Sequence, residues 1–520
     1  MPKESTLLII LDGWGVPNKN SKASAISTKT APNFFNLLKQ YPNTQLVASG
    51  SGVGLAEGQE GNSEAGHLNI GAGRVVKQDL LYVSDAIKDG SFFKNNAFLE
   101  AIYHAKKYQT SVHLMGLLSN HNSAHSCPEH LYALLDLFAE QGMKKVYLHL
   151  FTDGRDSGQH DAQTFLTLLK EHFHGSEKIA TIMGRYYGMD RNKVWERTEA
   201  AYNAIVSSKG KKAESAEEAI KMAYNSGETD EFISPTVIVE NDKPVSNIKD
   251  NDVIFFFNLR SDRARQLTKA FVQSDFGKDN PGAFHRQSKP KNIRFVAMTD
   301  FGPDLHSIIT AFPSRDVKNS MVQAMCPLRQ LYVAESEKFA HITYFLNGGY
   351  AQHFCDEQWV KIESDRLKDF ETKPEMKAKE IADYVIKAVE RGEHDFIGVN
   401  FANADMVGHT GSISAGEKAI AELDKELGRI VATAKKHKAV CVITADHGNA
   451  EEMINPKTGE VDSEHSVNPV PFIIVCSEEK KKKIKLKKNL KKGKLCDVAP
   501  TILKIMNLKQ PEEMTGKALF

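Results

Sequence analysis

Three short apolar runs, each followed by an acidic residue, constrain the fold of this chain more than any other feature. The runs and their acidic residues are Thr6–Leu11 with Asp12, Phe396–Phe401 with Asp405, and Val440–Ala445 with Asp446. Apolar runs without alternation are typical of strands buried on both faces of a parallel sheet. Since ligands of such sheets bind at the carboxyl ends of the strands, we expect these acidic groups to converge there.

The positions of these runs predict a discontinuous domain that carries an insertion. One run starts at residue 6, and the other two lie beyond residue 395 on either side of a helical pattern over Ser412–Lys436, which makes a βαβ unit. The middle of the chain has a strand–helix rhythm of its own. Strands are expected at Ser111–Leu118, Lys145–Phe151, Lys178–Met183 and Asp252–Asn258, and helices at His130–Glu140, Ala162–His172, Arg191–Ser207 and Arg263–Ser274. We therefore predict two α/β domains, one of residues 1–79 and 313–520 and an inserted one of residues 80–312.

Composition narrows the class of protein. The 520 residues are 41% apolar and 26% charged, as in ordinary globular proteins, and the net charge is +1. With so small a net charge, the protein as a whole has no electrostatic attraction to nucleic acid or to an acidic membrane. The six cysteines form no CxxC pair and suggest free thiols in a reducing compartment. With neither a signal-peptide pattern nor an apolar stretch that could span a bilayer, we expect a cytoplasmic protein.

A lysine-rich run is the one compositionally biased segment. Lys480–Lys494 contains ten lysines, and no aromatic residue lies among them. Such a run could bind a polyanion, but we favour a solvated surface loop or hairpin, because the missing aromatic residues argue against nucleic-acid binding.

Aspartates and histidines in the outer parts of the chain could bind metal ions. Asp405 and His409 are four residues apart and would share one face of a helix, while Asp446 and His447 end a strand. His465 and Asp12 complete a set that suits Zn²⁺ or Mn²⁺ better than Ca²⁺ or Mg²⁺. Six ligands exceed one tetrahedral site, so two metals are expected. The alternative is that each aspartate merely caps a helix or a turn.

Ser63 is a candidate nucleophile. It lies in the segment GNSEAGH, where a polar turn containing glycine precedes Leu68–Gly73. A metal near such a hydroxyl lowers its pKa and activates it. Alternatively, Ser63 or Asn62 caps a short helix.

Arginines recur after three predicted strands of the middle domain. They belong to the segments Asp153-Gly-Arg155-Asp156, Gly184–Arg191 with Arg185 and Arg191, and Asn258–Arg265 with Arg260 and Arg263. Because a guanidinium binds carboxylate or phosphate through two parallel hydrogen bonds, three such groups predict a small polyanionic ligand.

Together these segments resemble those of the cofactor-independent (2,3-bisphosphoglycerate-independent) phosphoglycerate mutases, nearly end to end. The matching segments are LLIILDGWG, GNSEAGH, LFTDGRD, GRYYGMDR, NLRSDRAR, AESEKFAHITYFLNGG, VNFANADMVGHTG, TADHGNAEEM, DVAPTIL and PEEMTG. The family belongs with the alkaline-phosphatase-like metalloenzymes. The resemblance implies a phosphatase-like domain formed by both chain ends, an inserted transferase domain and a monomer.

The resemblance also implies the cofactors and the roles of residues. Two Mn²⁺ ions are implied, with other divalent metals possible and no 2,3-bisphosphoglycerate. One metal is held by Asp12, Ser63, Asp446 and His447, and the other by Asp405, His409 and His465. Substrate contacts are implied for His125, Arg155, Asp156, Arg185, Arg191, Arg260, Arg263 and Lys338. The loop 119–127 departs from the family pattern, because Cys127 stands where relatives have a histidine.

The implied reaction interconverts 3-phosphoglycerate and 2-phosphoglycerate in glycolysis and gluconeogenesis. Ser63 attacks the phosphoryl group, Lys338 stabilises its charge, and Asp156 exchanges protons with the glycerate hydroxyls. Two rivals share the metal ligands, a phosphomonoesterase and a phosphopentose mutase. Neither needs three groups of arginines to hold a small acid.

Overall fold

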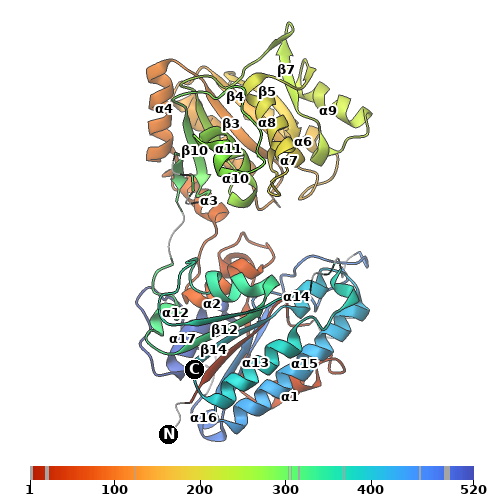
Figure 1. The fold of residues 1–520 in the computed structure, drawn as a ribbon, viewed down its shortest axis with the longest axis vertical. Coiled ribbons are helices and arrows are strands. Elements are labelled where there is room, and N and C mark those ends of the chain that lie inside the picture. Colours follow the sequence, from red (N-terminus) through yellow and green to blue (C-terminus); the bar gives the residue numbers. More distant parts are fainter. Residues whose placement is uncertain are drawn as a thin grey trace. The chain divides into compact units, whose positions relative to one another are not determined.

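The computed structural model describes residues 4–17, 23–121, 123–302, 304–305, 307–313, 317–365, 367, 369–455, 458–484 and 492–520. The chain divides into two compact units (Figure 1). Unit 1 comprises Met1–Gln78 and Arg315–Phe520, and unit 2 comprises Asp79–Ser314. The expected boundaries, after residues 79 and 312, differ from these by one and two residues.

Unit 1 is built on an eight-stranded sheet in the order β13-β12-β14-β1-β15-β16-β2-β17. Its strands are β1 (Thr6–Leu11), β2 (Asn43–Val47), β12 (Gln330–Glu335), β13 (Gln358–Ile362), β14 (Phe396–Phe401), β15 (Val440–Thr444), β16 (Val470–Val475) and β17 (Gly493–Lys494). Strand β1 pairs in parallel with β14 on one side and β15 on the other, and Leu7–Leu11 are fully buried. The prediction that the three apolar runs share one sheet is confirmed. The sheet is mixed, because β16 is antiparallel to β15 and β2.

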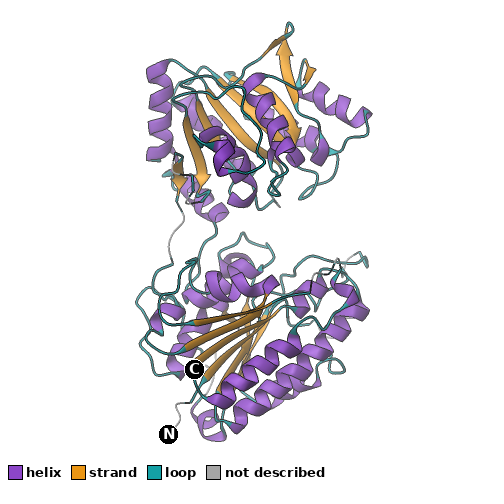
Figure 2. Ribbon diagram, in the orientation of Figure 1, coloured by secondary structure: helices purple, strands orange, loops and turns teal. Residues whose placement is uncertain are grey.

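Helices cover the sheet of unit 1 (Figure 2). They are α1 (Pro32–Gln40), α2 (Ser63–Ala72), α12 (Met321–Ala324), α13 (Ala378–Arg391), α14 (Asn403–Gly408), α15 (Ile413–Lys436), α16 (Glu478–Lys483) and α17 (Val498–Ile505). The helix predicted between the last two apolar runs is α15, with Ser412 at its N-cap. Part of the lysine-rich run, residues 485–491, lies outside the described residues.

Unit 2 has its own sheet, in the order β11-β10-β9-β3-β4-β5-β7-β6 with β8 paired to β7. The strands are β3 (Val112–Leu118), β4 (Val146–Thr152), β5 (Glu177–Gly184), β6 (Lys211–Ala213), β7 (Thr236–Glu240), β8 (Lys243–Pro244), β9 (Val253–Phe256), β10 (Arg294–Thr299) and β11 (Ile309–Phe312). The helices are α3 (Asp79–Lys88), α4 (Asn96–Tyr108), α5 (Pro128–Glu140), α6 (Ala162–Lys170), α7 (Arg185–Gly188), α8 (Trp195–Ser207), α9 (Ala216–Asn225), α10 (Ser261–Val272) and α11 (Phe276–Asp279).

Neighbouring side chains along the strands of unit 2 belong to two different hydrophobic clusters. On β9, Val253 and Phe255 belong to the cluster that includes residues of α4, α5 and α6, whereas Ile254 and Phe256 belong to the cluster of α8 and α10. Successive strand side chains point to opposite faces, so the sheet is covered by helices on both faces. This is the α/β arrangement predicted for the middle domain.

One predicted helix of unit 2 begins later than expected. The pattern predicted a helix from Arg191, but α8 begins at Trp195. The Asp190 carboxylate accepts hydrogen bonds from the backbone N–H groups of Asn192 and Val194, which stabilises a loop before the helix.

The expectation that all cysteines are free thiols is wrong for two of them. The structure pairs Cys326 with Cys355, whose Cα atoms are 5.9 Å apart, a separation typical of a disulfide. Cys127, Cys441, Cys476 and Cys496 are free and buried. Sequence spacing gave no sign of the pair, because the two residues are 29 positions apart. Within the described part of the chain, no helix combines the length and the apolar character needed to cross a membrane.

Candidate active site

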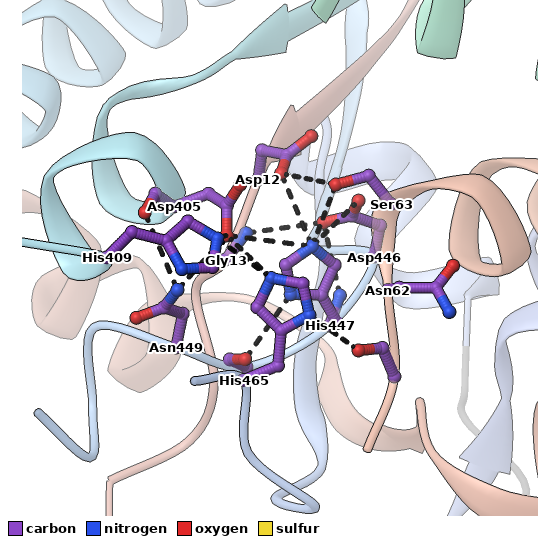
Figure 3. Close-up of polar contacts among 12 residues, drawn as sticks. Asp12, Gly13, Asn62, Ser63, Asp405, His409, Asp446, His447, Asn449 and His465 are labelled. Atoms are coloured by element: carbon purple, nitrogen blue, oxygen red, sulfur yellow. Dashed lines mark hydrogen bonds and ion pairs between the residues drawn. The ribbon is translucent and has the colours of Figure 1, made fainter. Parts of the chain in front are cut away.

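Acidic side chains of unit 1 converge at the carboxyl ends of three neighbouring strands (Figure 3). Asp12 follows β1, Asp405 lies on α14 directly after β14, and Asp446 and His447 follow β15. All four residues are buried. Gly13 permits this convergence: its φ is +73°, and a Cβ there would lie 2.6 Å from the Cα of Asp405. The predicted meeting of strand-end aspartates is therefore observed.

Helix α2 presents Ser63 to this cluster. Asn62 is the N-cap, and its side chain accepts a hydrogen bond from the N–H of Ala65 at 2.9 Å. Because Asn62 caps the helix, Ser63 is left free of that role. Its Oγ lies 3.1 Å from Asp12 Oδ1 and 2.9 Å from His447 Nε2 (Figure 3).

Two overlapping groups of side chains could hold metal ions. Asp12, Asp446 and His447 form one group, and Asp405, His447 and His465 form the other, with the ligand atoms of each group within 4.8 Å of one another. His409 lies beside the second group, since its Nε2 is 3.3 Å from Asp405 Oδ1 and 3.1 Å from His465 Nε2. The residues expected from the sequence as ligands are thus brought together.

The histidines have the tautomer that metal ligation requires. The Nδ1 atoms of His409 and His465 face the carbonyl oxygens of Ser463 and Gly61 at 2.6 and 2.8 Å, and that of His447 faces its neighbour's carbonyl at 3.3 Å. A carbonyl only accepts hydrogen bonds, so each Nδ1 carries the proton. Each Nε2 is then available to a metal, and a carbonyl partner of this kind fixes the ring.

Charge in the cluster also fits divalent cations. Three buried carboxylates face one buried ammonium, that of Lys338, and Asp446 Oδ2 lies 3.1 Å from His67 Nδ1 and 3.5 Å from His447 Nε2. Burial alone would lower the pKa of His447, but Asp446, Asp12 and Asp405 raise it to about 10. The metal-free site therefore attracts protons strongly, as expected of a cation site.

Lys338 lies closer to the proposed nucleophile than its sequence position reveals. It ends the short helical turn Ser336–Lys338 after β12, and its Nζ is 2.7 Å from Ser63 Oγ, 2.7 Å from Asp12 Oδ1 and 2.6 Å from Asp405 Oδ2. Burial alone would lower the pKa of this ammonium, but the surrounding aspartates raise it, so the side chain stays charged. A fixed positive charge at Ser63 Oγ favours the alkoxide.

Several residues that the sequence analysis missed hold the ligands in place. The Nδ2 of Asn449 donates to Asp405 Oδ1 at 3.1 Å, and Glu451 accepts from the N–H of Gly15 and of Asn449 at 2.9 Å each. His67 and Asn400 are fully buried behind the same cluster. The spacing of His67, one helical turn after Ser63, was the signal that could have indicated it.

In unit 2, the predicted arginine groups also lie at strand ends. Asp153, Arg155 and Asp156 follow β4, Arg185 follows β5, and Arg260 and Arg263 lie at the start of α10 after β9. Strands β9, β3, β4 and β5 are neighbours in this order. The buried Arg185 donates from Nη1 to Asp153 Oδ1 at 2.5 Å and to Asp156 Oδ2 at 3.0 Å. Arg191 donates to Asp262 Oδ2 at 2.8 Å.

The arginines of these segments lie close enough to affect one another, although carboxylates lie among them. Burial lowers the pKa of Arg263, and the positive charges of Arg185, Arg191 and Arg155 lower it further, whereas the carboxylate of Asp262 opposes this. Arg263 donates to the carbonyl of Met189 at 3.4 Å, and Arg155 lies 3.7 Å from Glu231. Several guanidinium groups gathered at neighbouring strand ends could bind an anion.

His125 belongs to this region despite the altered loop around it. It is buried, and its Nδ1 has no hydrogen-bond partner among the described residues. Burial and the positive charges of Arg185 and Arg260 lower its pKa to about 4. Cys127 lies at the N-cap of α5 and its thiol contacts Glu129 instead, while Asn122 of the same loop lies outside the described residues. His125 is thus a neutral imidazole beside arginines.

Comparisons with known proteins agree with both halves of this description. The family model "BPG-independent PGAM N-terminus" matches residues 83–303, and the model "Type I phosphodiesterase / nucleotide pyrophosphatase" matches residues 289–468. A 2,3-bisphosphoglycerate-independent phosphoglycerate mutase of Methanosarcina acetivorans is 47% identical over 99% of this chain and 98% of its own length. The chain belongs to the 2,3-bisphosphoglycerate-independent phosphoglycerate mutases, in the alkaline phosphatase superfamily.

Further relatives show the same full-length match. The 2,3-bisphosphoglycerate-independent phosphoglycerate mutase of Clostridioides difficile is 45% identical, with 100% of both chains covered. A crystal structure of Leishmania mexicana phosphoglycerate mutase at low cobalt concentration has a TM-score of 0.76 and 27% identity, covering 100% of this chain and 98% of that chain. The family resemblance and the fold expected from it are confirmed.

Proposed function

We propose that this mutase interconverts 3-phosphoglycerate and 2-phosphoglycerate through a phosphoserine on Ser63, with two divalent metals and without 2,3-bisphosphoglycerate. The observation that supports it most is the surroundings of Ser63 Oγ. This hydroxyl lies within 3.1 Å of Asp12 Oδ1, His447 Nε2 and Lys338 Nζ together. The hydroxyl is not used to cap α2, because Asn62 caps that helix.

We assign the metal ligands from the family resemblance, and the two overlapping groups support that assignment without dividing the residues between two ions. Asp12, Ser63, Asp446 and His447 would hold one ion, and Asp405, His409 and His465 the other. Bound there, divalent metals neutralise phosphoryl oxygens and lower the pKa of a serine hydroxyl. Mixed Asp/His ligation suits Mn²⁺, with other divalent ions as alternatives; cobalt is named for the Leishmania mexicana relative.

The chain's own groups would carry the transfer. Ser63 releases its hydroxyl proton to water as the alkoxide forms. Its oxygen then bonds to phosphorus while the bond from phosphorus to the glycerate oxygen breaks, and the leaving oxygen takes up a proton from water through Asp156. The ammonium of Lys338 stabilises the alkoxide of Ser63 and the negative charge that develops on the phosphoryl oxygens. The reverse transfer to the other glycerate hydroxyl gives the isomer.

Unit 2 would hold the glycerate and its anionic groups. We assign this binding to Arg155, Arg185, Arg191, Arg260, Arg263 and His125, and proton exchange with the glycerate hydroxyls to Asp156. Burial alone would raise the pKa of Asp156, but the guanidinium of Arg185 lowers it. A substrate anion on Arg185 would reduce that effect and make Asp156 a better base.

The setting of the reaction is part of the proposal. Because the phosphoglycerates are glycolytic intermediates, we propose that the protein acts in glycolysis and gluconeogenesis in the cytoplasm. We propose that it acts as a monomer on a small-molecule substrate, with neither nucleic acid nor membrane as a partner.

A coupled assay tests the proposal. The purified full chain is stripped with chelator and supplied with 3-phosphoglycerate, enolase and Mn²⁺, and phosphoenolpyruvate and free phosphate are measured together. We expect metal-dependent phosphoenolpyruvate without free phosphate, and loss of this activity in Ser63→Ala. The matched control is Ser215→Ala, at the N-cap of α9 in unit 2, which should keep it. Free phosphate without phosphoenolpyruvate would mean that the site is a phosphatase.

A further inference from the structure

A fully buried histidine and asparagine connect the proposed nucleophile to its neighbouring aspartate. His67 lies on α2, one helical turn after Ser63, and Asn400 lies on β14 next to β1. Neither side chain is exposed. Both therefore act only through the groups that they contact, not through substrate.

The amide of Asn400 has one orientation that satisfies its neighbours. Its Nδ2 lies 2.7 Å from Asp12 Oδ2 and 2.9 Å from His67 Nε2. The reversed amide would place its oxygen against the Asp12 carboxylate, and two acceptors at this distance repel each other. Nδ2 therefore donates one hydrogen to Asp12 and the other to His67.

This orientation sets the tautomer of His67. Since Nε2 accepts from Asn400, the proton lies on Nδ1, and Nδ1 is 2.9 Å from the carbonyl oxygen of Ser63. The same Nδ1 is 3.1 Å from Asp446 Oδ2.

The contacts close into a ring that starts and ends at Ser63. Ser63 Oγ donates to Asp12 Oδ1 at 3.1 Å, Asp12 Oδ2 accepts from Asn400, Asn400 donates to His67, and His67 donates to the Ser63 carbonyl. We propose that His67 and Asn400 are positioning residues, which hold the Ser63 hydroxyl and the Asp12 carboxylate in one fixed geometry. The inference rests on the proposed function, in which Ser63 is the nucleophile.

The ring predicts an effect on one metal site only. Asp12 belongs to the ligand group that includes Asp446, whereas Asp405 of the other group is contacted by Lys338 and Asn449, neither of which belongs to the ring. Hydrogen bonds behind ligands typically affect metal affinity or activity by about 10- to 100-fold. Breaking the ring should therefore weaken one Mn²⁺ site and leave the other close to its original affinity.

The test uses His67→Gln, Asn400→Ser and the double variant of the full chain. We expect each single change to lower kcat about 10- to 100-fold, with KM for 3-phosphoglycerate within about twofold. Isothermal titration of metal-stripped protein with Mn²⁺ should show one of two sites weakened. Because the ring is broken by either change, the double variant should lose no more than about threefold beyond the worse single variant.

A matched control variant distinguishes the effect of breaking the ring from the effect of replacing any buried histidine. His130 is a fully buried histidine of α5 in unit 2, where its Nε2 contacts Ser84. We expect His130→Gln to retain kcat and both Mn²⁺ affinities. An equal loss of kcat in this control would overturn the inference, because any buried histidine would then have the same effect.

The other possible results of these measurements also count for or against the proposed ring. Losses that multiply in the double variant, a rise in KM at unchanged kcat, or two Mn²⁺ sites of unchanged affinity would each overturn the ring. If His67→Gln does not fold, the smaller polar change Asn400→Ser decides by the same measurements. A wild-type chain that forms no phosphoenolpyruvate overturns the proposed function instead, whereas an active mutase with unaffected variants overturns the ring alone.

Discussion

The strand-end sites of the two units use histidine in opposite electrostatic surroundings. In unit 1, three aspartates raise the pKa of His447 to about 10, although burial opposes this. In unit 2, burial and the neighbouring arginines lower the pKa of His125 to about 4. Both sites lie at the carboxyl ends of strands, so the backbone geometry is alike and the charged side chains decide the ligand. This contrast supports our proposal that one site binds cations and the other binds anions.

The largest expected effect is that of metal on unit 1. Removal of divalent metal should abolish mutase activity, and Mn²⁺ at about 100 times its Kd should stabilise its binding unit by about 2.7 kcal/mol per site. Hydrogen exchange of the metal-stripped and Mn²⁺-loaded chain checks where this occurs. Slower exchange is expected in β1, β14 and β15, with β4 and β5 unchanged. Equal protection of both units would contradict the division into cation and anion sites.

Arg263→Met tests the anion site. A hydrogen bond to a charged group contributes about 1.5–3 kcal/mol, so we expect KM for 3-phosphoglycerate to rise about 10- to 100-fold. Mn²⁺ affinity should not change. Thermal stability should change little, because the change removes repulsion from Arg185, Arg191 and Arg155 together with attraction to Asp262. The control is Arg329→Met, an exposed arginine paired with Asp395 in unit 1, which should leave KM unchanged.

Acid should destabilise unit 2 through its buried histidines. The pKa of His125 and of His130 is lowered to about 4, from an unfolded value near 6.5. As pH falls through 6.5 the unfolded chain takes up protons that the folded unit does not, so stability is lost between pH 6.5 and about 4. Each pKa unit corresponds to about 1.4 kcal/mol. Urea unfolding at several pH values should show this slope, and His130→Gln should reduce it.

Without metal, the stability of unit 1 should fall as the pH rises above neutrality, which is the opposite direction to unit 2. The pKa of His447 is raised in the folded state, so its contribution to stability is complete below pH 6.5 and is lost as pH rises through about 10. Mn²⁺ requires neutral histidine, and its presence should remove this loss. Hydrogen exchange of β15 at pH 7 and pH 9, with and without Mn²⁺, measures the difference. After correction for the intrinsic exchange rate at each pH, an equal loss of protection at pH 9 in both samples would count against a metal at His447.

The sequence predicted the parts of the fold that depend on local pattern. The apolar runs at Thr6–Leu11 and Phe396–Phe401 have the bounds of β1 and β14, because a strand buried on both faces needs apolar residues at consecutive positions. The converging aspartates followed from sheet geometry alone. The mixed character of the sheet did not, since β16 and β2 pair through contacts between segments more than 400 residues apart.

The sequence could not predict which side chains contact one another. Lys338 could be assigned to the active site only by resemblance, and its contact with Ser63 joins residues 275 positions apart. Asn400 carries no charge and sits within an apolar strand, so no pattern distinguished it from a packed residue. Whether Ser63 or Asn62 capped α2 was likewise open, because both side chains can accept from a backbone N–H.

The smallest expected effect compares two helix caps. Asn62 caps α2 in unit 1 and Ser215 caps α9 in unit 2, each through a hydrogen bond to a backbone N–H. Replacing either by alanine should cost about 1 kcal/mol of stability, measured by urea unfolding. Only Asn62→Ala should also lower kcat, by a few fold, because the first turn of α2 holds Ser63 against Asp12. Equal kcat values for the two variants would mean that Asn400 and His67 hold Ser63 without help from the cap.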